Sequence, residues 1–332
     1  MAVLAATHPT LLDLAKRMDP DKKIATIIEI LNETNEILDD MVWVEGNLLT
    51  GHKTTVRTGL PTPTWRKLYG GVQPTKSTTA QVMDSCGMLE AYSEVDKALA
   101  DLNGNTAEFR FSEDLPHLTG INQTLSSALF YANEATTPEK FTGFAPRFNS
   151  LSAENGQNII VGDGAGSDNT SVWLIVWGPN TCHGIVPKGS TAGMQMTDKG
   201  QVTIENIDGS GGRMEAYRTH FRFDAGLTVR DWRYVVRIAN IDKSNLVKDA
   251  ATGSDLIDLM TQALEQVQDL NVGRPAFYCS RTVRSFLRRQ MVAAVKQSTL
   301  TMDMIAGRRV LAFDGVPVRR CDALAADEAL VS

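Results

Sequence analysis

Apolar residues recur every three or four positions in several stretches of the chain, which is the spacing of one helix face. In residues 20–40 this pattern follows two aspartates and Pro20, which are residues that often begin a helix. The same spacing predicts further helices over residues 84–101, 114–133, 254–271 and 281–298. Ser254 stands at the expected cap of the fourth helix. The fifth is both amphipathic and basic.

A second set of segments has the composition of strands. Between residues 158 and 241, short runs of β-branched and aromatic residues alternate with glycine clusters. A strand is also expected around Val42 and Val44, and a short buried strand at residues 276–280. Residues 308–324 predict a hairpin that turns at Asp314-Gly315. Helical and strand segments together indicate an α+β fold.

Residues 41–83 interrupt this regular pattern. Threonine and glycine are frequent there, and three prolines exclude helix locally. An extended stretch of about forty residues is unusual in a compact domain and is usually functional or disordered. Trp65, Leu68 and Tyr69 argue against simple disorder, because disordered segments are poor in such residues. The composition favours an arm that packs on another subunit.

The charge is segregated along the chain. The net charge of −6 argues against a dedicated nucleic-acid-binding protein. Residues 1–50 and 84–114 are acidic, whereas residues 281–320 hold nine bases and two acids. Residues 51–83 hold five bases and no acid: Lys53, Arg57, Arg66, Lys67 and Lys76. Long blocks of one sign suggest that one segment meets another, within the chain or between copies, although ordinary surface variation gives similar blocks.

The glycines of residues 162–166 resemble a phosphate-binding loop. A dinucleotide fingerprint, however, needs G-x-G-x-x-G followed by a helix, and here the spacing is G-x-G-x-G. The next run, residues 172–177, has the composition of a strand. These glycines therefore most simply join two strands in a hairpin or loop. An enzyme that uses this loop for phosphate is the alternative.

The sequence contains no complete catalytic or metal-binding motif. Cys182 and His183 are neighbours, but adjacent strand residues point to opposite faces, so a dyad is poorly placed and Cys182 fits a core position. The five histidines lack metal-ligand spacing. Asp39, Asp40 and Asp163 could bind a hard cation, although no calcium-loop motif surrounds them. We expect no catalytic residue, cofactor or metal.

Cellular location is constrained by what the sequence contains. The four cysteines are widely spaced without a C-x-x-C pair, which favours free thiols in a reducing cytoplasm. No apolar run of about 18 residues predicts a membrane span. The N-terminus does not have the pattern of a secretory signal. We therefore expect no membrane partner.

Four phrases of the sequence resemble major capsid proteins of tailed bacteriophages, in particular the coat proteins of short-tailed phages. They are LFYANEATTPEKFTGFAPRFNSLS (129–152), TSVWLIVWGPNTCHGIVPKGSTAGM (170–194), GLTVRDWRYVVRIANID (226–242) and LAFDGVPVRRCDAL (311–324). The resemblance extends from about residue 20 to residue 332. It implies the Hong Kong ninety-seven fold and a structural role in an icosahedral shell around double-stranded DNA. A different virion component, such as a tail protein, is the alternative.

The resemblance also implies a domain order. It assigns residues 1–40 to an N-terminal arm and helix, and residues 41–83 to the extended loop, or E-loop. Residues 84–152 would form the peripheral domain, and residues 153–305 the axial domain. Residues 306–332 would form a hairpin that returns to the peripheral domain. The long helix of the peripheral domain is either 114–133 or 84–101.

The implied partners are further copies of the chain, in hexamers and pentamers. Residues 41–83 would reach over a neighbouring subunit and meet its acidic segments. The candidate contact residues are Lys53, Arg57, Trp65, Arg66, Lys67, Tyr69 and Lys76, with Arg284, Arg288 and Arg289 on the basic helix. No long helical segment precedes the arm, so we expect a separate scaffolding protein. Portal and decoration proteins are further expected partners, and assembly is expected in the cytoplasm of the host bacterium.

Overall fold

The fold was analysed in a computed structural model. It describes residues 35–104, 106–190, 193–205, 211–247, 253–292, 300–305 and 308–332, together with Pro9 and Glu33. The chain divides into two compact units, each built from separate stretches of sequence. The described parts of the first unit lie within residues 88–126 and 193–224, with Pro9 and Glu33. The second unit holds the described parts of residues 35–87, 127–190 and 225–332.

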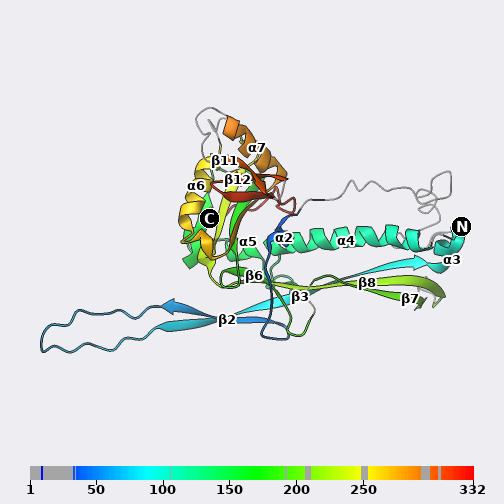
Figure 1. Cartoon of the computed structure of the whole chain (residues 1–332), viewed down its shortest axis with the longest axis horizontal. Helices are drawn as coiled ribbons and strands as arrows, with labels where there is room; N and C mark the ends of the chain where they lie inside the picture. Colours follow the sequence, from blue (N-terminus) through cyan, green and yellow to red (C-terminus); the bar gives the residue numbers. More distant parts are fainter. Residues whose placement is uncertain are drawn as a thin grey trace. The chain divides into compact units, whose positions relative to one another are not determined.

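The first unit pairs a long helix with long strands (Figure 1). Its elements are the end of β3 (Thr78–Asp96), α3 (Lys97–Ala100), η1 (Asp101–Asn103), most of α4 (Thr106–Tyr131), β7 (Gln195–Glu205) and most of β8 (Arg213–Val229). β7 is antiparallel to β8, and β8 is hydrogen-bonded beside β3. Val95, Leu99 and Phe109 form a small buried cluster where α3 and α4 meet the strands.

The second unit is organised around β5 (Asn169–Trp177), a strand that is buried along its whole length. β9 (Val235–Asp242) and β10 (Arg274–Cys279) flank it, both antiparallel to it. The sheet continues through β4 (Ile159–Val161) beside β9, and through β13 (Val316–Arg320), β12 (Arg308–Phe313) and β11 (Leu300–Ile305) beside β10. β6 (Cys182–Val186) joins β5, β8 and β1 (Trp43–Glu45).

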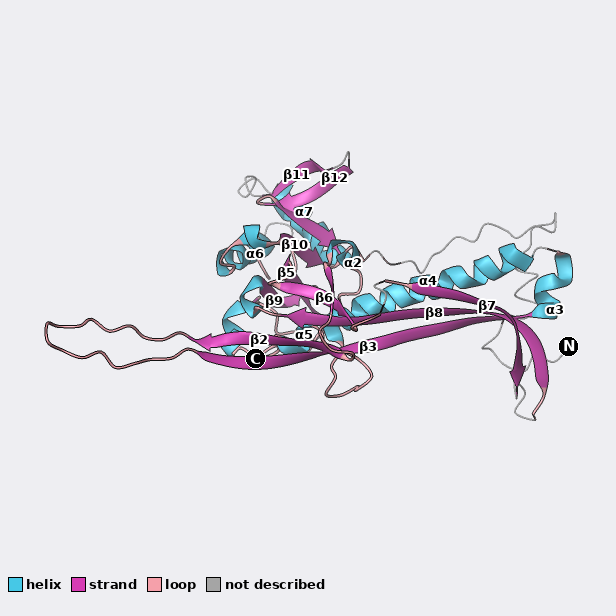
Figure 2. Ribbon diagram, turned by 60° about the horizontal axis from the view of Figure 1, so that its bottom comes forward, coloured by secondary structure: helices cyan, strands magenta, loops and turns pink. Residues whose placement is uncertain are grey.

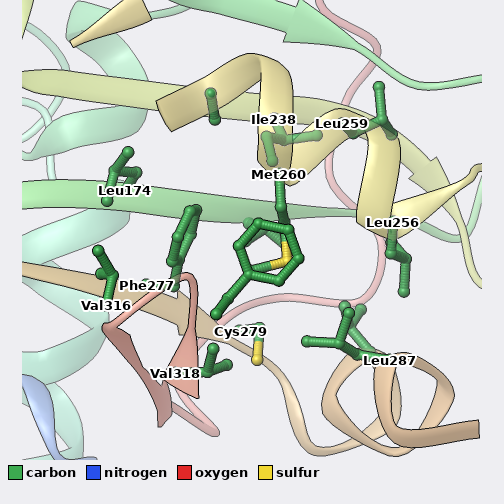
Figure 3. Close-up of a cluster of buried hydrophobic side chains, with 14 of the residues drawn as sticks. Leu174, Ile238, Leu256, Leu259, Met260, Phe277, Cys279, Leu287, Val316 and Val318 are labelled. Atoms are coloured by element: carbon green, nitrogen blue, oxygen red, sulfur yellow. The ribbon is translucent and has the colours of Figure 1, made fainter. Parts of the chain in front are cut away.

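Alternate side chains of β5 enter two different cores, as expected for a strand buried on both faces. Val172, Leu174 and Val176 pack in an aliphatic core with α6 (Leu256–Gln266) and α7 (Arg281–Val292), shown in Figure 3. Trp173 and Trp177 contact aromatic rings from the end of α4 and from α5 (Phe144–Arg147). Burial of these side chains is the main source of the unit's stability, at about 25 cal/mol per Å² of apolar surface.

Short elements complete the second unit. They are α2 (Ile37–Asp40), β2 (Gly51–Gly59), η2 (Glu154–Asn158), η3 (Trp232–Tyr234) and η4 (Leu270–Val272). The hairpin of β12 and β13 pairs with β10, while the C-terminal residues beyond it bond back to Leu151 and Tyr131. Asp314 and Gly315 at the hairpin turn both have positive φ, as an Asp-Gly turn of this type requires. The predicted hairpin and its turn are confirmed.

The predicted helix over residues 84–101 is wrong. Residues up to Asp96 belong to the 19-residue strand β3, and only Lys97–Ala100 are helical. Ser93 and Val95 are buried and Tyr92 is exposed, so this end of the strand alternates between two faces. β3 pairs with β2 as far as Ser85 and is also hydrogen-bonded beside β8, and local helical spacing did not outweigh that pairing. The long helix is α4, which begins eight residues before the predicted start at 114.

Two other helix predictions need smaller corrections. Asp255, not Ser254, caps α6 by accepting a hydrogen bond from the Asp258 backbone N–H. The Ser254 hydroxyl instead accepts from the backbone N–H of Asp163. Of the helix predicted over residues 20–40, the structure describes Glu33 and residues 35–40. Only Ile37–Asp40, α2, are helical, whereas Asn35 forms an isolated antiparallel bridge with Cys321. Of the helix predicted over residues 281–298, the described part is helical through Val292.

Candidate intersubunit interface

β2 and β3 form a two-stranded ribbon that continues into a long loop, residues 60–77 (Figure 2). Strand pairing runs from Gly51↔Ser85 to Arg57↔Thr79, then shifts register before Gly59↔Thr78. Beyond that point the two limbs are joined by few bonds, among them the Thr75 hydroxyl donating to the Thr62 carbonyl. The three prolines lack an N–H group, which explains why the ladder stops.

The loop exposes large apolar side chains. Trp65 and Tyr69 are as accessible as in an extended peptide, at 104% and 101% of the reference area, and Leu68 is 82% exposed. Tyr69 has a φ of 60° in a turn closed by the Gly70 N–H donating to the Lys67 carbonyl. Exposed aromatic side chains of this size are typical of sites that bury against a partner.

The five basic residues of this segment are all exposed. Lys53 and Arg57 lie on β2, Arg66 and Lys67 lie beside Trp65 in the loop, and Lys76 lies on the returning limb. Several acids that follow them along the chain have partners of their own. Glu94 pairs with Arg218 inside the first unit, and Glu90 lies 3.7 Å from Arg222. Residues 51–83 contain no acid, and these following acids already have basic partners. The positive charge of the ribbon and its loop is therefore not balanced by acids of the same segment.

The base of the ribbon is anchored in the second unit by polar contacts. Asp84 is buried and pairs with Arg147 at 2.8 Å, and Arg147 also donates to the Thr142 and Leu227 carbonyls. The Ser85 hydroxyl donates to Glu134 at 2.8 Å. The Asp84–Arg147 and Ser85–Glu134 contacts were not predicted, because each joins residues about fifty or more positions apart. These contacts fix the base of the ribbon to the second unit.

Two histidines lie against the same base. His52 on β2 and His183 on β6 place their rings 5.8 Å apart, nearly perpendicular, and His52 faces Asp84 across the ladder. Burial lowers the pKa of His183 to about 4, and the nearby His52 and Arg230 act in the same direction. Burial and Arg230 also lower the pKa of His52. Both rings are neutral at neutral pH, which suits a position near Arg230.

The three arginines predicted on the basic helix lie on α7. This helix is a different element from the β2–β3 ribbon and is far from it in sequence. Val283 and Leu287 bury one face of α7 in the aliphatic core. Arg288 and Arg289 are exposed on the other face, and the Arg289 guanidinium lies 4.9 Å from the Phe286 ring. Arg284 is half-buried. The described residues thus present a second basic surface, formed by Arg288 and Arg289.

The residues considered above for phosphate binding or catalysis lie in a loop or in the core. Residues 162–166 connect β4 to β5, and both strands pair with β9, so the segment is a loop between strands rather than the start of a helix. Cys182 is fully buried, and burial raises the pKa of its thiol far above the ordinary value. All four cysteines are free thiols. Within the described residues, no three His, Cys, Asp or Glu side chains are grouped to hold a metal.

A buried network ties the C-terminus to the sheet of the second unit. Arg237 on β9 forms an ion pair with Glu328 at 2.7 Å, and both side chains are about 5% exposed. Glu328 also accepts from the hydroxyls of Ser171 and Tyr131. Burial, and then the Glu328 carboxylate, raise the pKa of Tyr131, so this phenol stays protonated as a donor. In the part of the chain that the structure describes, no helix is long and apolar enough to cross a membrane.

The fold was compared with solved structures. A chain of the bacteriophage epsilon15 cryo-electron microscopy structure matches with a TM-score of 0.78 and 39% identity, over 100% of both chains. Weaker matches include the bacteriophage JBD30 capsid, at a TM-score of 0.48 and 8% identity over 89% of this chain and 93% of that one. No match was found among curated proteins. The fold is of the Hong Kong ninety-seven type and defines the class, a major capsid protein of a tailed bacteriophage.

The family is shown by its own sequence model. The model for "Major capsid protein GP7" matches residues 19–332, which is nearly the whole chain. The protein belongs to the GP7 family of major capsid proteins. Its role is therefore structural, as a building block of the phage capsid. The predicted family, fold and structural function are confirmed, and neither the phosphate-loop enzyme nor the tail-protein alternative gains support.

Proposed function

We propose that residues 41–83 are the E-loop and that the loop at 60–77 binds a neighbouring copy of the chain in the shell. The observation that carries this is the full exposure of Trp65 and Tyr69 on a ribbon with an anchored base. A monomer gains nothing from exposed aromatic rings, whereas a shell that repeats the contact many times gains collective stability.

The charges suggest which surface receives the loop. Lys53, Arg57, Arg66, Lys67 and Lys76 would meet acidic side chains of the next subunit, with Trp65 and Tyr69 in its apolar part. Arg284, Arg288 and Arg289 on α7 would supply a second contact of the same sign. Such charge complementarity would fix the register between copies more than it would add to affinity.

The shell is proposed to contain hexamers and pentamers around packaged double-stranded DNA. An acidic subunit suits a container whose cargo is contacted without sequence specificity. A scaffolding protein, a portal and decoration proteins are the expected further partners. Assembly is placed in the reducing cytoplasm of the host bacterium, in agreement with four free thiols.

The domain boundaries also remain a proposal. Residues 1–40 would be the N-terminal arm and helix, 84–152 the peripheral domain and 153–305 the axial domain. Residues 306–332 would carry the C-terminal hairpin toward the peripheral domain. The bonds from the C-terminus to Tyr131 and Leu151 support this last assignment, although β13 of the hairpin pairs with β10.

The test is to replace residues 60–77 by Asn-Gly, which joins the paired residues Gly59 and Thr78 by a hairpin turn. The shortened chain should fold, because the loop contributes little to either core, but it should form no closed shells. Negative-stain electron microscopy after sedimentation, with and without the co-expressed scaffold, reads out assembly. Shells at normal yield would contradict the proposal.

A single-residue variant distinguishes a specific role of the loop from the general effect of removing an exposed aromatic side chain. Trp65→Ala should lower the yield of shells at least tenfold while leaving the thermal midpoint of the unassembled subunit unchanged. Phe111→Ala removes an aromatic ring that is 66% exposed but lies on α4, so it is the matched control. Equal losses from both variants would show that the loop has no special part in the contact.

A further inference from the structure

The glycine loop between β4 and β5 lies against a wall of oxygen atoms. A Cβ on Gly164 would lie 2.3 Å from the Asn240 carbonyl oxygen and 2.5 Å from Asn169 Oδ1. A Cβ on Gly166 would lie 2.8 Å from Asp242 Oδ2 and 3.4 Å from Asp168 Oδ1. Glycine is required at Gly164 because the carbonyl, which belongs to the backbone, cannot move aside.

Two carboxylates of this wall are neighbours. The backbone N–H of Ser244 donates to Asp168 Oδ2 at 3.1 Å and to Asp242 Oδ1 at 3.0 Å. The Ser244 hydroxyl also lies between them, at 2.8 Å from Asp242 Oδ1 and 3.4 Å from Asp168 Oδ1. Sharing one donor places the two carboxylates side by side, and Asp242 also accepts from the backbone N–H and the Nδ2 of Asn245 at 3.3 and 2.8 Å. Two adjacent carboxylates favour a nearby cation.

A third oxygen faces the same loop from a buried position. Asn169 is 1% exposed, and its Nδ2 donates to the Gly166 carbonyl at 2.6 Å. Its Oδ1 is buried without a hydrogen-bond partner and is directed at Gly164. A buried amide oxygen without a donor costs about 1–3 kcal/mol, so this oxygen is a position that a water molecule or a cation would stabilise.

We propose that the Gly162–Gly166 loop binds one Ca²⁺ ion per chain, through Asp168 Oδ1, Asp242 Oδ2 and Asn169 Oδ1. The cation neutralises the carboxylate pair and satisfies the amide oxygen. Carboxylate and amide oxygens are hard ligands, and Ca²⁺ accepts the irregular geometry and water ligands that such a partly open loop offers. Mg²⁺ fits less well because it demands a near-ideal octahedron.

The bound ion would join segments that are distant in sequence. Asp168 directly precedes β5 and Asn169 begins it, whereas Asp242 ends β9 opposite Asn169 in the ladder. The ion would therefore fix the β4–β5 loop to the end of β9. The sequence has no calcium-loop motif at this site, because the ligands come from two separate segments and one ligand is an asparagine. This role goes beyond shell assembly and does not depend on it.

The test is a calorimetric titration of the full-length, unassembled chain with CaCl₂ after removal of metal by EDTA. The wild-type protein should show one saturable site, and Ca²⁺ should raise its thermal unfolding midpoint. Asp168→Asn should weaken Ca²⁺ binding at least tenfold and abolish the thermal shift. In EDTA the same variant should unfold at the wild-type temperature or above it, because one of two adjacent charges is gone.

Asp163→Asn is the matched control, since Asp163 is exposed in the same loop and contacts Ser254 through its backbone N–H only. It should bind Ca²⁺ like the wild type. Asp242→Asn repeats the test from the second strand if Asp168→Asn does not fold. The proposal is overturned if the wild type shows no saturable site, if Asp168→Asn or Asp242→Asn binds normally, or if Mg²⁺ binds in preference to Ca²⁺.

Discussion

Arg237 and Glu328 show what a single buried pair does in this protein. The Arg237 guanidinium donates to Glu328, to the Ser171 hydroxyl and to the Phe148 carbonyl, and it lies 5.2 Å from the Trp173 ring. Every polar group of the pair therefore has a partner, which is the condition for keeping charges in a core. This guanidinium thus joins Phe148 and Ser171 to Glu328 near the C-terminus.

Glu328→Gln should lower the free energy of unfolding of the unassembled subunit by about 3–5 kcal/mol, because it leaves Arg237 as a buried charge without its counter-ion. Urea denaturation measures the change. Combining it with Arg237→Met should cost less than the sum of the two single changes, as a double-mutant cycle would show. A loss of less than about 1 kcal/mol would contradict a stabilising role for the pair.

His183 makes the stability of the base depend on pH. Its pKa is about 4 in the folded protein and near 6.5 in the unfolded chain, so the unfolded chain binds more protons between these values. Stability is complete above about pH 6.5 and falls as the pH drops toward 4, with a loss of about 2 kcal/mol from this residue between pH 7 and pH 5. The lowered pKa of His52 acts with the same sign.

Chemical denaturation at pH 7 and pH 5 measures this effect. His183→Gln should flatten the decline between the two pH values, whereas His117→Gln, a change on α4, should retain it. The lowered pKa values of Asp198 and Asp231 affect a lower range, because these carboxylates lose their stabilising effect only as the pH falls below their ordinary pKa. An unchanged slope in His183→Gln would exclude this histidine as the cause.

At the scale of elements, the long helix α4 contains a residue that disfavours helix. It is a 26-residue helix with Pro116 in its interior, where proline removes a hydrogen bond and crowds the preceding turn. Buried contacts on one side, including Ile121 and Leu125, hold the helix despite this cost. Tertiary packing, rather than intrinsic propensity, therefore determines the length of the helix.

Pro116→Ala should stabilise the unassembled subunit by about 1–2 kcal/mol, since alanine restores the bond and favours helix, while the more flexible unfolded chain offsets part of the gain. The thermal midpoint and the urea midpoint should both rise. Pro146→Ala, in the short helix α5, controls for the general effect of removing a proline. A decrease in stability would show that the helix needs its proline for packing.

At the scale of the whole molecule, charge separates folding from assembly. The bases of the β2–β3 ribbon and its loop are exposed, so their reversal should change the unfolding free energy by about 0.5 kcal/mol or less. The same reversal would place like charges against an acidic neighbour in the shell, which is strongly unfavourable. Folding and assembly are thus carried by different residues.

The double variant Arg57→Glu, Lys76→Glu should therefore fold normally and assemble poorly. Particle yield by sedimentation and the thermal midpoint of the subunit measure the two properties side by side. Lys140→Glu, at an exposed base outside the ribbon, should leave both unchanged. High salt should weaken wild-type assembly in the same direction, since it screens exposed charges. Normal yield from the double variant would exclude the charge complementarity proposed above.

The sequence by itself determined those features whose cause is local. The Asp314-Gly315 turn, the strand at β10, the helix that became α4 and the nature of residues 162–166 as a loop were all predicted, because neighbouring residues specify them. An extended segment over residues 41–83 was predicted for the same reason, since prolines exclude helix and bases without acids need solvent or a partner; the loop at 60–77 lies within it. Particular phrases of the sequence also indicated the family.

Tertiary structure decided whatever depends on residues far apart in the chain. Residues 84–96 became a strand because β3 pairs with β8, and with β2 as far as Ser85, although their local pattern also fits a helix. The Asp84–Arg147 anchor, the Arg237–Glu328 pair and the oxygen wall behind Gly164 join segments that no local pattern connects. Pairing and burial energies belong to contacts, and contacts exist only once the chain has folded.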